Sequence, residues 1–226
     1  MSTASPPRVT FRLAGLLLAF GCAVFAVGVL RYALLPSDLG LPADQSSYQN
    51  ALKEATSRTA EMMLAGRVIF VGDILVAAAA LALLSRRRYL GVDLERVGWA
   101  LVFVSFLPAF VFDSLMGSAL PHLATDAPGS FAAFKSWFDF QFAAGNIPFG
   151  IGGALVFFAD ARSARPTLPP VADYVAVAVC GITLIGGLGY VLGLFVGWQL
   201  NGPPLLLAAI ALGALGIQIA RQERAG

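Results

Sequence analysis

Charged and amide side chains occur inside segments that are otherwise apolar enough to cross a membrane, and these residues are the candidates for chemistry. They are Arg67, Asp73, Asp113, Asp139, Gln141 and Asn146. An ionised group near the middle of a bilayer costs about 2.5–3.5 kcal/mol on insertion scales. Such groups are therefore expected either to pair with one another or to serve a ligand or ion.

Arg67 and Asp73 lie in the same apolar segment, six residues apart. At 3.6 residues per turn, this spacing places them about 120° apart around a helix. They are therefore not expected to pair with each other. The expected partner of Arg67 is a carboxylate on another helix, with Asp113 the first candidate and Asp139 the second, because all three are expected near the outer membrane surface.

Two interpretations of these residues remain open. In the structural one, Arg67 and Asp113 form an ion pair between helices, and Asp139 pairs with Lys135 four residues earlier on its own helix. In the functional one, the same candidate set lines an outward-opening polar cavity that binds a ligand head group or moves a proton. Asp73 would lie at its floor, since packing alone does not account for an unpaired acid near the middle of the membrane.

Other kinds of chemistry find little support in the sequence. His122 is the only histidine and has no His or Cys partners, so neither a metal site nor haem ligation is expected. Cys22 and Cys180 lie in apolar segments and are expected to be free thiols. No serine has a nearby base, so we expect no catalytic residue and no cofactor. Basic residues are not interleaved with aromatics, which argues against nucleic-acid binding.

The composition shows which elements must position the candidates. The chain has 226 residues, of which 58% are hydrophobic and 12% are charged, with a mean hydropathy of +0.78. Its apolar content comes in blocks of about 20 residues, the length that spans a bilayer as a helix. The sequence therefore predicts an all-α polytopic membrane protein, with six transmembrane helices in one bundle and a single domain over residues 1–226. The predicted spans are about 13–35, 62–84, 97–120, 136–159, 171–196 and 205–220.

The distribution of arginine predicts the orientation of the bundle. With six spans, both termini share one side with the loops that contain Arg86 and Arg162, and most of the basic residues fall on that side. The positive-inside rule then places both termini in the cytoplasm. We expect a multi-pass protein of a bacterial cytoplasmic (inner) membrane, with the lipid bilayer as its surroundings.

Local patterns add four expectations. Residues 48–56 predict a short amphipathic helix, and residues 121–129 a turn-rich connection. Pro148, among glycines, predicts a kink or break in the fourth span. Three glycines spaced by four predict close packing of the fifth span on the sixth or on a second copy in a homo-oligomer. They are Gly189, Gly193 and Gly197.

Several short motifs resemble a bacterial six-helix membrane family known as domain of unknown function 4386. The resemblance covers about residues 10–220. It rests on Arg12-Leu13-Ala14-Gly15-Leu16-Leu17 in the first span, Ala65-Gly66-Arg67 at the start of the second, and Thr167-Leu168-Pro169 with Gly189-Tyr190 around the fifth. The Arg86–Arg88 loop and the Asn146–Pro148 segment depart from that pattern. The resemblance implies an integral membrane protein and no particular reaction.

Three functions are compatible with this sequence. The leading one is a non-enzymatic membrane protein that binds a small molecule or lipid, or that acts within a membrane complex. The alternative is a proton-coupled transporter or carrier that uses Asp73 and Asp113. The third is a membrane-embedded enzyme, which is disfavoured because no nucleophile–base pair or metal-ligand set is present.

Overall fold

The computed structural model describes residues 11–33, 45–84, 94–194 and 200–222. These residues form helices, with no strand among them. The helices are α1 (Phe11–Ala33), α2 (Gln45–Ser57), α3 (Thr59–Leu83), α4 (Leu94–Met116), α5 (Ala119–Asp126), α6 (Pro128–Ala161), α7 (Pro170–Val191) and α8 (Gly202–Gln222).

The predicted fold class is confirmed. Six helical segments in the described residues are long and apolar enough to cross a membrane. They correspond to α1, α3, α4 with α5, α6, α7 and α8. The chain is therefore an all-α multi-pass bundle. The predicted spans match these helices with shifts of a few residues, except that α6 begins at Pro128, well before the predicted residue 136.

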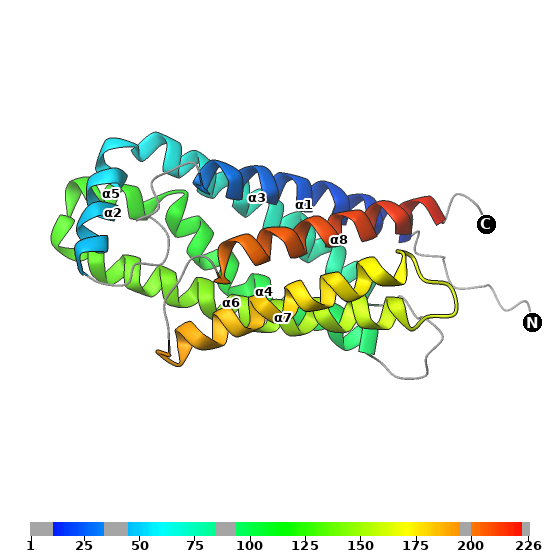
Figure 1. The fold of residues 1–226 in the computed structure, drawn as a ribbon. Coiled ribbons are helices and arrows are strands. Elements are labelled where there is room, and N and C mark those ends of the chain that lie inside the picture. The colour runs from blue at the N-terminus through cyan, green and yellow to red at the C-terminus, as the bar shows by residue number, and fades with distance from the viewer. Residues whose placement is uncertain (1–10, 34–44, 85–93, 195–199, 223–226) are drawn as a thin grey trace, which may run out of the picture.

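The long helices form a ring in which each packs against its neighbour along the chain. α1 packs on α3, α3 on α4, α4 on α6, α6 on α7 and α7 on α8, and α8 returns to α1. Figure 1 shows the two short helices, α2 and α5, together at one end of the bundle. We call this the capped end. The start of α1 and the end of α8 lie at the opposite end.

Large apolar side chains cover the outside of the long helices. Examples are Leu13, Phe20, Val71, Leu107 and Ile185, all exposed. A soluble protein rarely exposes continuous apolar surface of this kind, whereas lipid-facing helices require it. The apolar exterior and the helix lengths together indicate a lipid bilayer as the environment.

Glycines bring the helices of the ring close together. A Cβ added at Gly150 of α6 would lie 2.7 Å from the carbonyl oxygen of Cys180 on α7. A Cβ added at Gly187 of α7 would lie 2.6 Å from the carbonyl oxygen of Ala143 on α6. Both distances are shorter than a carbon–oxygen contact allows. The α6–α7 contact therefore depends on the absence of side chains at these positions.

The predicted packing face of Gly189, Gly193 and Gly197 needs correction. α7 ends at Val191, and Gly193 has a positive φ of 67° with no atom near the position of a Cβ. The N–H of Leu194 donates to the carbonyl of Gly189, which is the hydrogen bond of a Schellman helix end. Gly193 thus terminates the helix instead of packing it. Gly189 is buried within α7, and Gly197 lies outside the described residues.

Two further expectations about local structure need correction. α6 is one helix from Pro128 to Ala161 that contains Pro148, so the fourth span is not broken there, and the alternative of a kink stays a prediction. The connection predicted as turn-rich over residues 121–129 is helical for most of its length, because α5 covers Ala119–Asp126. The predicted amphipathic helix over residues 48–56 is confirmed as α2.

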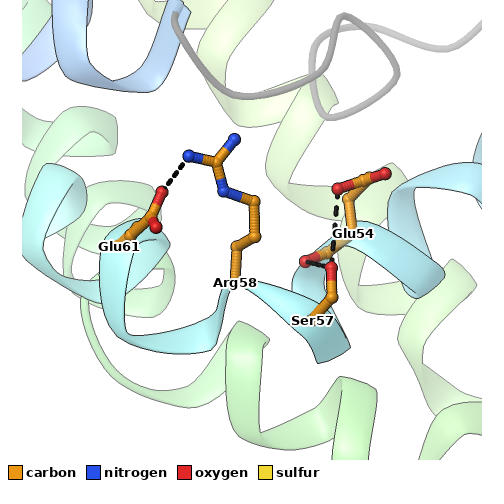
Figure 2. Close-up of polar contacts among 4 residues, drawn as sticks. All are labelled: Glu54, Ser57, Arg58 and Glu61. Atoms are coloured by element: carbon orange, nitrogen blue, oxygen red, sulfur yellow. Dashed lines mark hydrogen bonds and ion pairs between the residues drawn. The ribbon is translucent and has the colours of Figure 1, made fainter.

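Polar side chains organise the junction at which the chain turns from α2 into α3 (Figure 2). The Ser57 hydroxyl donates to the Glu54 carbonyl oxygen at 3.1 Å and lies 3.5 Å from its carboxylate. Arg58, between the two helices, forms an ion pair with Glu61 in the first turn of α3. These contacts lie on the surface, where α2 of the capped end joins the second span.

Candidate functional site

A cavity lies inside the bundle, in the half nearer the capped end. Its walls come from α1, α3, α4, α6 and α8, while no described residue of α7 lines it. The cavity volume is about 70 Å³, on the measure in which one buried water needs about 10–15 Å³. The cavity therefore has room for several waters or for a small organic molecule.

The lining is mainly aromatic and aliphatic. Its aromatic residues are Phe25, Tyr32, Phe106, Phe112, Phe138, Phe142 and Phe149. The phenylalanines also contact one another in edge-to-face pairs, with ring centroids 5.5 Å apart for Phe112 and Phe138 and 6.4 Å apart for Phe106 and Phe149. The expectation of a polar cavity is wrong in this respect: it is an apolar cavity with a few polar groups in its wall.

Asp73 and Asp113 are the most unusual of these polar groups. Asp73 lies near the middle of α3 and is 0% exposed, and Asp113 lies in the last turn of α4 and is 2% exposed. Neither oxygen of Asp73 receives a hydrogen bond from an N–H or O–H group, nor does Oδ2 of Asp113. The two carboxyl groups lie within hydrogen-bonding reach of each other. Two carboxylates can share such a contact only when a proton lies between them.

Asp139, the third acid in the wall, has a cation beside it. Lys135, one turn earlier on α6, forms an ion pair with Asp139, and both side chains are fully buried. The Lys135 ammonium also lies 5.3 Å from the centre of the Phe138 ring. The predicted pairing of Asp139 with Lys135 is confirmed. Oδ2 of Asp139 has no hydrogen-bond partner.

Arg67 and Gln141 do not belong to the cavity. The Arg67 side chain is exposed, and its Nε donates to the carbonyl oxygen of Gly117, at 3.0 Å, just past the end of α4. The expected ion pair of Arg67 with Asp113 is therefore wrong, since Asp113 faces Asp73 in the interior. Gln141 is only partly buried and is not among the lining residues. Of the six candidates, Asp73, Asp113, Asp139 and Asn146 come together at the cavity.

The structure adds a polar contact that sequence reasoning missed. Nδ2 of Asn146 donates to Oδ1 of Asn201 at 3.0 Å, and both residues are buried. Asn201 comes directly before α8, so this contact joins α6 to the start of the last span. In the sequence, Asn201 stands between Leu200 and Gly202-Pro203-Pro204 and has the pattern of a turn residue. The length and apolar character of the spans gave no signal for its burial.

Tyr32 is the other lining residue that the sequence did not single out. It lies in the last turn of α1 and is 8% exposed. A tyrosine near the end of a span has the pattern of a residue at the membrane–water interface. Its place in the cavity wall depends on the direction in which α1 faces, which the sequence around it does not specify.

The fold and this cavity define a class of protein: a six-span helical membrane protein with acidic side chains buried in an apolar internal cavity. Among the residues that the structure describes, no three His, Cys, Asp or Glu side chains are placed to hold one metal ion. Comparisons with protein-family models, curated proteins and solved structures gave no significant match to the chain.

Proposed function

We propose that the protein binds a small, mainly apolar molecule inside the membrane, in the cavity lined by α1, α3, α4, α6 and α8. The observation that supports this proposal is the cavity itself. Cores of helical bundles are normally filled to the density of organic crystals. An internal space with an aromatic lining and a few convergent polar groups is the usual form of a small-molecule site.

Filling the cavity tests this proposal. Ala209 of α8 lines the cavity, whereas Ala214, five residues further on, is exposed on the outside of the bundle. We expect Ala209→Leu to weaken the binding of a neutral probe, cyclohexanol, at least tenfold, because the larger side chain occupies its space. Ala214→Leu should leave the affinity within twofold. The measurement is the shift in unfolding temperature of the detergent-purified protein with increasing cyclohexanol.

Each outcome of this experiment has a clear meaning. Binding that Ala209→Leu abolishes and Ala214→Leu preserves supports a ligand in the cavity. Equal shifts in all three proteins would mean that cyclohexanol acts on the detergent or the outer surface, and would contradict the proposal. Should Ala209→Leu fail to give a folded protein, Cys22→Leu on the α1 wall takes its place.

A second function, a proton-coupled carrier, is favoured by one specific observation. Asp73 and Asp113 are two facing carboxyl groups from different helices, and such a pair can hold or release a proton as the helices move. Proteoliposomes containing the protein should then show uptake of substrate driven by a pH gradient. Uptake that Asp73→Asn leaves unchanged would contradict this function.

The distribution of basic residues supports a further proposal, which concerns the membrane that holds the protein and the side on which its termini lie. We propose a bacterial cytoplasmic membrane with both termini in the cytoplasm, because most of the basic residues fall on the side of the termini. Membership in domain of unknown function 4386 stays a prediction from the short motifs quoted above.

A further inference from the structure

We infer that the ligand of this cavity is a small organic cation, an amine in its ammonium form, held by Asp73 and Asp113. The inference rests on the proposed function, since it names the chemical class of the molecule bound at the same site. Three observations carry it: the hydrogen-bonding groups that remain free in the wall, the absence of a basic side chain among the described lining residues, and the apolar surroundings.

Tyr32, Ser105 and Asn146 carry the donor groups of the wall, yet three oxygens of its facing carboxyl pair receive no hydrogen bond. The Ser105 hydroxyl already donates to the carbonyl oxygen of Val102 at 2.6 Å, and the Asn146 amide donates to Asn201. In contrast, both oxygens of Asp73 and one oxygen of Asp113 receive no hydrogen bond from a donor group. A buried acceptor without a donor is destabilising. A ligand that satisfies this wall must therefore supply N–H or O–H groups.

The charge of the wall favours a cation over a neutral donor. No Lys, Arg or His is among the described residues that line the cavity. Lys135 of α6, which lies outside the lining, is already paired with Asp139. A facing carboxyl pair that shares one proton between one oxygen of each acid carries a single negative charge and keeps its other two oxygens without a donor. A monovalent ammonium group would neutralise this charge and donate to those two oxygens at the same time. Burial makes such a pair worth more than it would be in water.

The remainder of the lining favours an organic cation over an inorganic one. Ca²⁺ and Mg²⁺ require about six or more oxygen ligands or retained waters. Around Asp73 and Asp113 the wall instead presents Phe106, Phe112 and Ala109. Aromatic side chains pack well against the hydrocarbon part of an amine, and their ring faces attract its positive charge. The site thus matches a molecule with one cationic end and an apolar body.

Two probes of nearly the same shape test this inference. They are cyclohexylammonium, which is charged, and cyclohexanol, which is neutral, and binding is measured by the shift in unfolding temperature in detergent at pH 7. We expect the wild-type protein to bind cyclohexylammonium at least tenfold more tightly than cyclohexanol. Asp73→Asn should abolish this preference by weakening cyclohexylammonium binding, so that the two probes then bind within twofold of each other. Asp126→Asn removes an exposed carboxylate from α5 and should change neither affinity.

The results separate the inference from the function on which it rests. If both probes bind equally to the wild-type protein and Ala209→Leu prevents this, the cavity binds small molecules but has no preference for cations, and the inference is wrong. If Ala209→Leu weakens the binding of neither probe, the probes do not bind in the cavity and the proposed function itself is wrong. Should Asp73→Asn not fold, Asp113→Asn is the second variant. If neither variant folds, the wild-type protein still tests the inference, because equal binding of the two probes would contradict it.

Discussion

Lys135 and Asp139 lie one turn apart on α6, and both are buried away from water. Removing two charges from water is costly, and their mutual attraction only partly offsets this. Removing one partner leaves the other charge buried alone, which typically costs about 3–5 kcal/mol. A single substitution in this pair is thus expected to lower the free energy of unfolding strongly.

A double-mutant comparison tests this view of the pair. We expect Lys135→Met to lower the free energy of unfolding by about 3–5 kcal/mol, because Asp139 then remains buried without its cation. Adding Asp139→Leu to Lys135→Met should recover most of this loss, since no buried charge is left. The measurement is reversible unfolding in mixed micelles. A double variant as unstable as Lys135→Met would show that the ion pair itself, and not the orphaned acid, determines the stability.

Arg67 shows where prediction from the sequence stops at the residue scale. The pairing of Lys135 with Asp139 was predictable because both residues lie on one helix with a spacing of four. The place of Asp73 and Asp113 within apolar spans was also predictable, because it follows from the local sequence. The direction in which each helix faces is a tertiary property, however, and it turns Arg67 outward to Gly117 while it brings Asp113 to Asp73. Residue spacing alone does not contain that rotation.

At the scale of elements, glycine positions determine how closely α6 and α7 approach. A Cβ at Gly187 would lie 2.6 Å from a backbone oxygen of α6, and backbone moves less easily than a side chain. Gly181, on the same helix, has no atom within 4 Å of the corresponding position. The two glycines form a matched pair in which the backbone effect is the same and only the packing differs.

We expect opposite effects from alanine at these two positions. Gly187→Ala should destabilise the protein by about 1–3 kcal/mol, as overpacking of a tight contact does. Gly181→Ala should stabilise it by about 0.5–1 kcal/mol, because alanine restricts the unfolded chain and favours the helix. Unfolding temperatures of the two variants in the same detergent give the comparison. Equal effects would mean that the α6–α7 contact adjusts to a methyl group.

The elements also show which helix features the sequence could predict. Long apolar runs gave all six spans, because length and hydropathy are local properties. Proline and glycine were less reliable indicators. Pro148 predicted a kink or a break, and α6 is unbroken there, since neighbouring helices can accommodate the missing N–H. Gly193 was assigned to packing, but it ends α7, because its positive φ allows the chain to leave the helix.

At the scale of the whole molecule, each end of the bundle is expected on one side of the membrane, with the capped end outside the cytoplasm. The connection between α5 and α6 lies at the capped end, and the connection between α6 and α7 lies at the end that holds the termini. We expect alkaline phosphatase fused after Ala127 to be active outside the cytoplasm. The same enzyme fused after Ser163 should be inactive. Phosphatase activity in intact cells measures both, and the reverse pattern would contradict the orientation that the arginines predict.

The closure of the ring by α8 on α1 has a consequence for biosynthesis. At this contact, a Cβ on Gly15 would lie 2.6 Å from the carbonyl oxygen of Gly216, so the backbones of α1 and α8 approach each other closely. α8 also supplies Leu205, Ala209 and Leu212 to the cavity wall. A ribosome makes this helix after the other helices that the structure describes. During translation, Asp73 and Asp113 therefore enter the membrane while one wall of their cavity is still missing, and until α8 arrives their shielding from lipid depends on the helices already inserted.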